Sequence, residues 1–178
     1  MWLDLHADDH LSADYGHIAP TNQVPCLEID GRRLMQSVAI IEYLEETRAA
    51  PALMPGSAAA RAEIRSVVEL INSGIQPLHN IAVRRRLGVQ FGASESAAND
   101  WCRYWLERRF LALDQLLART SGKYACGDEP TLADVLLYPQ VMTSGRFGVR
   151  AADFPVLSKV VANLAGLVPF HESHPPSA

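Results

Sequence analysis

The sequence lacks the features that would indicate a membrane protein, a nucleic-acid-binding protein or a disulfide-bonded secreted fold. No apolar run approaches the roughly 20 residues that a helix needs to cross a bilayer. Lys and Arg total 16 against 20 for Asp and Glu, so there is no basic excess to attract nucleic acid or an anionic membrane. The three cysteines are odd in number and widely spaced, which suits a reducing cytoplasm. We therefore expect a cytoplasmic protein without a nucleic-acid or membrane partner.

What is present is the composition of a folded domain. The 178 residues are 48% hydrophobic and 20% charged, which indicates one globular domain or two small ones that share a core. The opening residues have neither a basic region nor a long apolar core, so they are typical of neither a signal nor a transit peptide. The six histidines show no metal-ligand spacing, and we expect no metal site.

Three short segments near the N-terminus have the pattern of strands. Residues 2–5 predict a strand on their own. Apolar alternation over 25–29 and again over 32–35, separated by Asp30-Gly31, predicts a hairpin, because Asp-Gly suits a two-residue turn.

The rest of the sequence predicts helices, separated from the first part by a loop near 48–57. The first helix has Ser37 as N-cap and ends before Pro51, and the second continues past Gly74 and Pro77 with a bend. The tail 171–178 is expected to fray. Apolar residues recur at helical spacing over 38–44, 64–71, 106–117, 131–144 and 154–164.

A capping box marks one of these helix starts. Thr131 follows Pro130, and Asp134 stands three residues later, ahead of an apolar run. The threonine hydroxyl can accept from the amide of Asp134, whose carboxylate can accept from the amide of Thr131. We expect this pair to contribute about 1–2 kcal/mol to folding and to have no role in a site.

Two dipeptides could meet a ligand. If the Val24–Pro25 bond is cis, the amide and carbonyl of Val24 point away from the sheet and can pair with an extended ligand. The alternative is an ordinary strand start. Gln36-Ser37 stands at a helix start whose free amides and dipole suit a carboxylate, although a simple N-cap is the commoner arrangement.

Taken in order, these features resemble the zeta class of glutathione transferases, which includes maleylacetoacetate isomerases and bacterial maleylpyruvate isomerases. The resemblance covers nearly the whole chain, and the run 36–48 is its most specific part. It also rests on segments 23–25, 29–31, 51–55, 74–80, 127–134, 138–141 and 146–147.

The resemblance implies an α+β, mostly helical fold. An incomplete thioredoxin-like glutathione-binding domain, residues 1–50, would pack on an all-helical C-terminal domain, residues 57–178. The implied activity is glutathione-dependent cis–trans isomerisation of the maleylacetoacetate type, with glutathione and a small maleyl dicarboxylate as ligands and a homodimer as the assembly. Two alternatives stay open: a maleylpyruvate isomerase, and a non-catalytic binding or dimerisation module.

The resemblance also implies roles for single residues. Arg146 would clamp a substrate carboxylate, a task that suits its planar guanidinium. Gln76 and Asn80, four apart on one expected helix face, would reach toward glutathione and substrate. The implied glutathione-binding residues are Val24, Gln36, Ser37, Gln76 and Asn80.

One family feature has no counterpart. Family members carry a Ser-Ser-Cys-type motif at the start of a helix that follows the first strand, and its serine activates the glutathione thiol. The 178 residues contain no such motif, and Cys26, Cys102 and Cys126 do not replace it. No catalytic residue is therefore assigned. We expect the chain as given to bind glutathione weakly or not at all and to have no isomerase activity.

Three further features each allow two interpretations. Arg84-Arg85-Arg86 attracts an acidic substrate or, more commonly, forms a solvated helix face. Trp101 and Trp105 share a helix face and serve core or subunit packing, or a substrate wall. His79, next to Asn80, is a general base or, as we favour, a packing and hydrogen-bonding residue.

Overall fold

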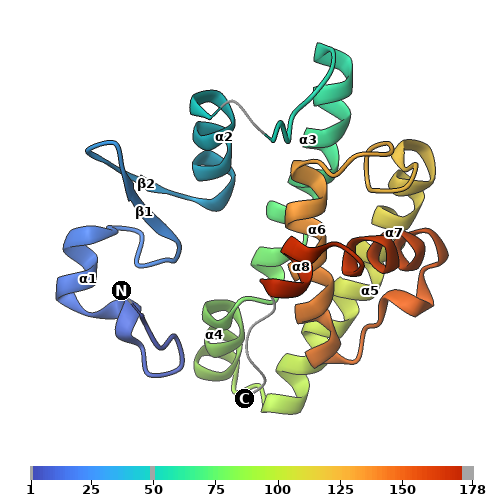
Figure 1. Cartoon of the computed structure of the whole chain (residues 1–178). Coiled ribbons are helices and arrows are strands. Elements are labelled where there is room, and N and C mark those ends of the chain that lie inside the picture. The colour runs from blue at the N-terminus through green and yellow to red at the C-terminus, as the bar shows by residue number, and fades with distance from the viewer. Residues whose placement is uncertain (1, 49–50, 174–178) are drawn as a thin grey trace. The chain divides into compact units, whose positions relative to one another are not determined.

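The computed structural model describes residues 2–48 and 51–173, and the chain divides into two compact units, Met1–Ala52 and Leu53–Ala178 (Figure 1). The first unit is blue to cyan in Figure 1, and the second continues from there to red. Among the described residues, no helix is long and apolar enough to span a bilayer.

The first unit is built around one β-hairpin, as predicted. β1 and β2 pair antiparallel with Cys26 opposite Met35. Asp30 and Gly31 have φ values of 51° and 69°. Two positive φ values are what a two-residue turn needs if its twist is to match that of the two strands. The elements of the unit are the 3₁₀ turn η1 (Asp9–Leu11), α1 (Ala13–Ile18), β1 (Cys26–Ile29), β2 (Arg32–Met35) and α2 (Ser37–Thr47).

Hydrogen bonds from two tyrosines hold the parts of this unit together. The Tyr43 hydroxyl on α2 donates to Asp30 Oδ2 in the hairpin turn at 2.8 Å, and α2 packs against β2. The Tyr15 hydroxyl on α1 donates to the Gln23 carbonyl at 2.8 Å. The first bond therefore joins α2 to the hairpin turn, and the second joins α1 to the segment that leads into β1.

The predicted strand at residues 2–5 is wrong. Asp4 Oδ1 accepts from the backbone N–H of His6 at 2.8 Å and of Ala7 at 3.3 Å, and the Asp4 amide donates to Asp9 Oδ2 at 2.8 Å. Carboxylates that bond nearby amides favour turns over extended chain. The segment is therefore irregular up to a turn at residues 5–8.

The position of Ser37 also differs from the expectation. The N-cap of α2 is Gln36, whose carbonyl accepts from the amide of Ile40 at 3.0 Å, so Ser37 is the first helical residue. Gln36 reaches this place with φ 72° and ψ 120°, a backbone conformation that residues other than glycine seldom adopt.

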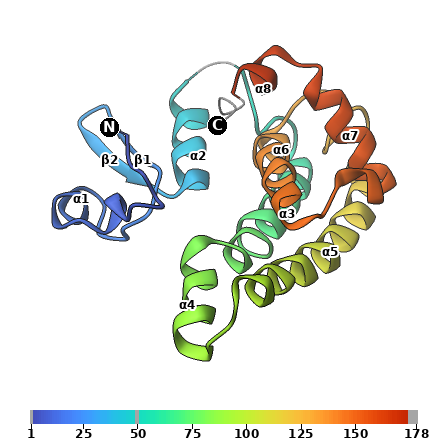
Figure 2. The same ribbon diagram turned by 90° about the horizontal axis from the view of Figure 1, so that it is seen from below.

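The second unit is helical throughout. Figure 2 shows the 26-residue helix α5 running along this unit, and α3, α4 and α7 all contact it. The helices are α3 (Ala58–Asn72), α4 (Ile81–Phe91), α5 (Glu95–Thr120), α6 (Leu132–Ser144), α7 (Pro155–Ala165) and α8 (Val168–Glu172), and the 3₁₀ turns are η2 (Gln76–Leu78), η3 (Gly145–Phe147) and η4 (Ala151–Asp153).

The core of this unit includes the predicted apolar stripes. α3 packs against α6 and α5, and α5 packs against α7. The stripe residues of α3 and α5 are all buried: Ile64, Val67, Val68, Ile71, Leu106, Phe110, Leu113 and Leu117. The capping box at Thr131 and Asp134 is also confirmed.

Two helix ends differ from the prediction. The second predicted helix does not bend past Gly74 but ends at Asn72. Pro77, which offers no N–H and restricts the residue before it, lies in the separate turn η2. The expected frayed tail contains α8 over its first residues, His171 and Glu172, and its last part, 174–178, lies outside the described residues.

One helix start depends on a distant side chain. The N-cap of α7 is Phe154, which makes no side-chain cap, and Pro155 occupies the first turn. Asp114 on α5 supplies the missing acceptor, because its Oδ1 accepts from Val156 N at 2.9 Å and Leu157 N at 2.8 Å. A carboxylate at this position also interacts favourably with the helix dipole.

Candidate glutathione and substrate site

The peptide bond between Val24 and Pro25 is cis, as the resemblance implied. The ladder between the two strands begins at Cys26, so the backbone amide and carbonyl of Val24 lie outside it. Val24 is also 45% exposed. Its main chain is thus placed to pair with an extended ligand as an added strand would.

The N-terminus of α2 is suited to an anion. The Gln36 side chain makes no capping hydrogen bond, whereas Ser12, Ser57, Asn80 and Ser94 cap α1, α3, α4 and α5. The first amides of α2 and its dipole therefore favour a carboxylate.

The first three candidate residues lie close together within the first unit. Gln36 Nε2 donates to Gln23 Oε1 at 3.3 Å, which places the start of α2 next to the Val24–Pro25 bond. Val24, Gln36 and Ser37 thus border one exposed region that offers backbone groups, a helix N-terminus and a hydroxyl.

The other three candidates belong to the second unit. Gln76 is exposed in η2, and Asn80 is the N-cap of α4, where its Oδ1 accepts from Val83 N at 2.9 Å. The expectation that Gln76 and Asn80 share one helix face is wrong, because no continuous helix joins them. Arg146 is exposed in η3, directly after α6.

His79 is buried, and its hydrogen-bonding role is confirmed. Its Nε2 lies 2.9 Å from Gln140 Nε2 and 3.2 Å from Gln140 Oε1, and its ring packs against Phe147 at a centroid distance of 5.7 Å. Burial, and to a smaller extent the positive charge of Arg84, lowers the pKa of His79. The ring is therefore neutral at neutral pH.

This burial predicts a pH dependence of stability. The unfolded chain protonates His79 near its usual pKa of about 6.5, whereas the folded chain does so only at lower pH. Because the unfolded state then binds more protons, the free energy of unfolding falls as pH drops below about 6.5. Urea midpoints from pH 7.5 to 5 measure this fall. The part of this fall that is due to His79 is expected to disappear in H79Q and to persist in H17Q, a change at an exposed histidine. An equal loss of stability with falling pH in both variants would contradict the assignment to His79.

The remaining sequence candidates, Arg84, Trp101 and Trp105, make packing contacts or hydrogen bonds within the second unit. Arg84 is partly buried, with its guanidinium 5.4 Å from the centre of the Phe147 ring, so a solvated face describes only Arg86. Trp101 is 37% exposed and donates to the Leu78 carbonyl at 2.9 Å, so it is not a core residue. Trp105 packs edge-on against it.

Neither cysteine of the second unit is suited to form a thiolate. Burial raises the pKa of the Cys102 thiol, and burial together with Asp134 raises that of Cys126 to about 11. Both therefore stay protonated at neutral pH, which agrees with their exclusion as replacements for the family's catalytic motif.

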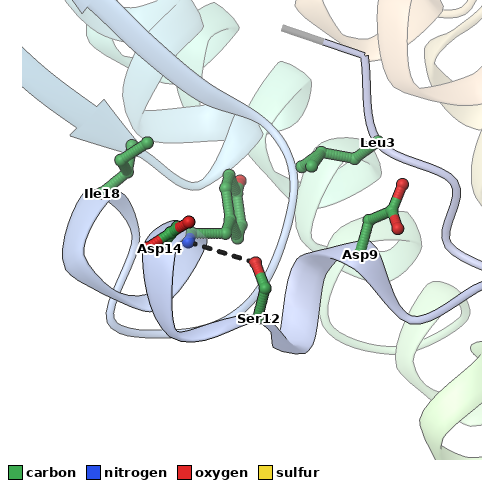
Figure 3. Close-up of a pocket in the computed structure, with 6 residues that line it drawn as sticks. Leu3, Asp9, Ser12, Asp14 and Ile18 are labelled. Carbon is green, nitrogen blue, oxygen red and sulfur yellow. Dashed lines mark hydrogen bonds between the residues drawn. The ribbon is translucent and has the colours of Figure 1, made fainter.

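A hollow of about 250 Å³ lies elsewhere in the first unit, around α1 (Figure 3). In Figure 3 Ser12 accepts from the amide of Tyr15 at one side of the hollow. None of the candidate residues lines it, so it is not the proposed glutathione site. Its lining residues are Leu3, Asp9, Ser12, Asp14, Tyr15 and Ile18.

Comparison with family models identifies both parts of the chain. Residues 2–47 match the N-terminal domain of glutathione S-transferases, and residues 95–167 match their C-terminal domain. A solved maleyl pyruvate isomerase, described as a bacterial glutathione S-transferase of the zeta class, is 36% identical with a TM-score of 0.92 over 98% of this chain and 85% of that one. The chain belongs to the glutathione transferase family.

Two further relatives carry the name maleylacetoacetate isomerase. The crystal structure of the protein from Methylobacterium extorquens AM1, with bound malonate and glutathione, is 30% identical with a TM-score of 0.94 over 98% of this chain and 83% of that one. Probable maleylacetoacetate isomerase 1 of Drosophila melanogaster is 40% identical over 91% of this chain, which spans 63% of its length. The expected α+β fold, with a thioredoxin-like part and a helical domain, is confirmed.

The expectation of an inactive chain stays a prediction that turnover by the purified protein tests, because this chain spans only 63–85% of the length of these relatives. The proteins that it matches over 91–98% of its own length are named as isomerases.

Proposed function

We propose that the protein is a glutathione-dependent cis–trans isomerase of the maleylacetoacetate type. The observation that carries this proposal is the likeness, at a TM-score of 0.94, to a maleylacetoacetate isomerase crystallised with glutathione. The cis Val24–Pro25 bond beside the uncapped N-terminus of α2 supports it independently. Residues 1–50 form the glutathione-binding domain and residues 57–178 the all-helical domain.

The residues have separate tasks in this proposal. The backbone of Val24 holds the cysteinyl part of glutathione, and Gln36 with Ser37 and the first amides of α2 holds the γ-glutamyl carboxylate. Gln76 and Asn80 contact glutathione and substrate, and Arg146 binds a carboxylate of the maleyl dicarboxylate. Bound glutathione would supply a thiolate that adds to the conjugated double bond and leaves again after rotation about the single bond that this addition creates.

Glutathione binding tests the first half of the site. Replacing Ser37 by alanine is expected to raise the Kd for glutathione by about tenfold or more, because a hydrogen bond to a charged group contributes roughly 1.5–3 kcal/mol. Calorimetric titration of the wild type, S37A, Q36A and S66A measures this effect. Ser66 is an exposed α3 serine whose hydroxyl donates to the Ala62 carbonyl of its own helix, so S66A serves as the matched control.

The outcomes of that titration are clear. A wild type without measurable glutathione binding contradicts the proposed function and favours a non-catalytic module. Equal Kd values for S37A and S66A remove Ser37 from the site but leave the function standing.

A second candidate activity is maleylpyruvate isomerisation. The TM-score of 0.92 to a solved maleyl pyruvate isomerase favours it, and Arg146 would serve either dicarboxylate. Turnover of both maleyl substrates by the purified protein, monitored by absorbance, separates the two.

We further propose a cytoplasmic homodimer. The odd number and wide spacing of the three cysteines support the location, and the family resemblance supports the dimer. Sedimentation equilibrium tests it, since a monomer mass at micromolar concentration would contradict the dimer.

A further inference from the structure

One buried polar group in the second unit is not explained by the proposed binding roles. His79 and Gln140 are 7% and 6% exposed, and Ser144 is fully buried. Together with Phe147 and the guanidinium of Arg84 they form what we call the His79 cluster. Buried polar groups of this kind are costly unless their hydrogen bonds are satisfied, and when satisfied they fix geometry.

The hydrogen bonds of the cluster form a chain that starts at His79. Gln140 approaches His79 Nε2 with its amide group, at 2.9 Å and 3.2 Å, and its Nε2 also donates to Ser144 Oγ at 3.3 Å. Ser144 Oγ in turn donates to the backbone carbonyl of Gln140 at 2.7 Å. Gln140 is therefore held on both sides, and the His79 ring cannot move without breaking a buried contact.

The same ring also determines the surroundings of η3. Phe147 packs against His79 on one side and lies under the Arg84 guanidinium, while its carbonyl accepts from Arg103 Nε at 3.0 Å. Three residues from separate parts of the second unit, His79, Arg84 and Arg103, thus hold this short turn. Arg146, the exposed residue just before Phe147, emerges from it.

The cluster connects two segments that carry proposed ligand-binding residues. His79 stands between Gln76 and Asn80 in the sequence, and its amide donates to the Gln76 carbonyl at 3.3 Å. We propose, on the basis of the proposed function, that His79 is a positioning residue: through Gln140 and Phe147 it holds the Gln76–Asn80 segment and Arg146 in a fixed relation. His79 then acts on the dicarboxylate through its neighbours, without touching it.

These contacts also argue against His79 as a general base. Its Nε2 is occupied by Gln140, and its ring is almost wholly buried. A base must reach the proton that it removes, directly or through one water molecule. A positioning role uses the contacts that are present.

Kinetic variants test this role. H79F keeps an aromatic ring against Phe147 but loses the bond to Gln140, and it is expected to raise the KM for the maleyl dicarboxylate about tenfold while kcat stays within about threefold. A purely structural role would lower the active fraction, and therefore kcat, with KM unchanged. H79Q retains an amide that can bond Gln140, so it is expected to recover part of the KM. H17F is the matched control.

A double-mutant cycle with R146A decides whether His79 acts through Arg146. If it does, the KM of H79F/R146A equals that of R146A within about twofold, because the residue being positioned is already absent. The inference is overturned if the effects of the two changes on KM multiply, or if the KM of H79F is unchanged. In either case, turnover by the wild type leaves the proposed function intact. A wild type without turnover contradicts both.

Discussion

Replacing Asp134 by alanine is expected to lower the free energy of unfolding by about 3 kcal/mol, the largest stability loss that we predict. Asp134 is fully buried. Its Oδ1 accepts from the Ala125 amide at 2.9 Å, and its Oδ2 accepts from the Thr131 amide at 2.8 Å and the Thr131 hydroxyl at 3.0 Å. Alanine leaves these buried donors without an acceptor, at roughly 1–3 kcal/mol for each unsatisfied group.

Urea unfolding followed by circular dichroism at 222 nm measures this loss. D128A is the matched control, because exposed Asp128 also accepts from a loop amide, that of Lys123 at 2.8 Å. We expect D128A to cost less than about 1 kcal/mol, since its partner returns to water. Equal losses in the two variants would show that burial of the capping box contributes nothing.

Replacing Arg146 by alanine is expected to raise the KM for the maleyl dicarboxylate about thirtyfold, the largest functional effect that we predict. A hydrogen bond between charged groups contributes roughly 1.5–3 kcal/mol, and a guanidinium can contact a carboxylate with two parallel bonds. R146K keeps the positive charge but cannot form two parallel bonds. We therefore expect it to reverse only a small part of the increase in KM that R146A causes.

Initial rates at saturating glutathione measure the effect of R146A. R150A is the control, because Arg150 is also exposed, lies four residues further on and pairs with Asp153 at 3.2 Å. We expect its KM to stay within about twofold of the wild type. If R146A behaves like R150A, Arg146 is not the clamp for the substrate.

Local sequence patterns predicted the elements whose determinants are themselves local. The hairpin follows from Asp30-Gly31, which provides both positive φ values, and the helical stripes follow from apolar spacing. The strand predicted over residues 2–5 was wrong because apolar alternation says nothing about a carboxylate that accepts from nearby amides, as that of Asp4 does.

The site was harder to predict, because its geometry depends on contacts between residues that are distant in sequence. The resemblance supplied Val24, Gln36 and Ser37, yet nothing in the sequence indicated that a Gln23–Gln36 hydrogen bond joins the two segments. The bond between His79 and Gln140 spans 61 positions. The apolar spacing over 64–71 likewise did not show that α3 ends at Asn72 and that Asn80 caps a new helix.

The cap that Asp114 provides to α7 has a consequence for the order in which the second unit opens. The first amides of α7 find their acceptor on α5, 42 positions earlier in the chain, and Phe110 packs edge-on against Phe154 beside it. Hydrogen exchange at Val156 and Leu157 therefore reports on the separation of the two helices, in addition to any fraying of α7. We therefore expect the two helices to open as one cooperative unit, although a loop, a helix and two short turns separate them in the chain.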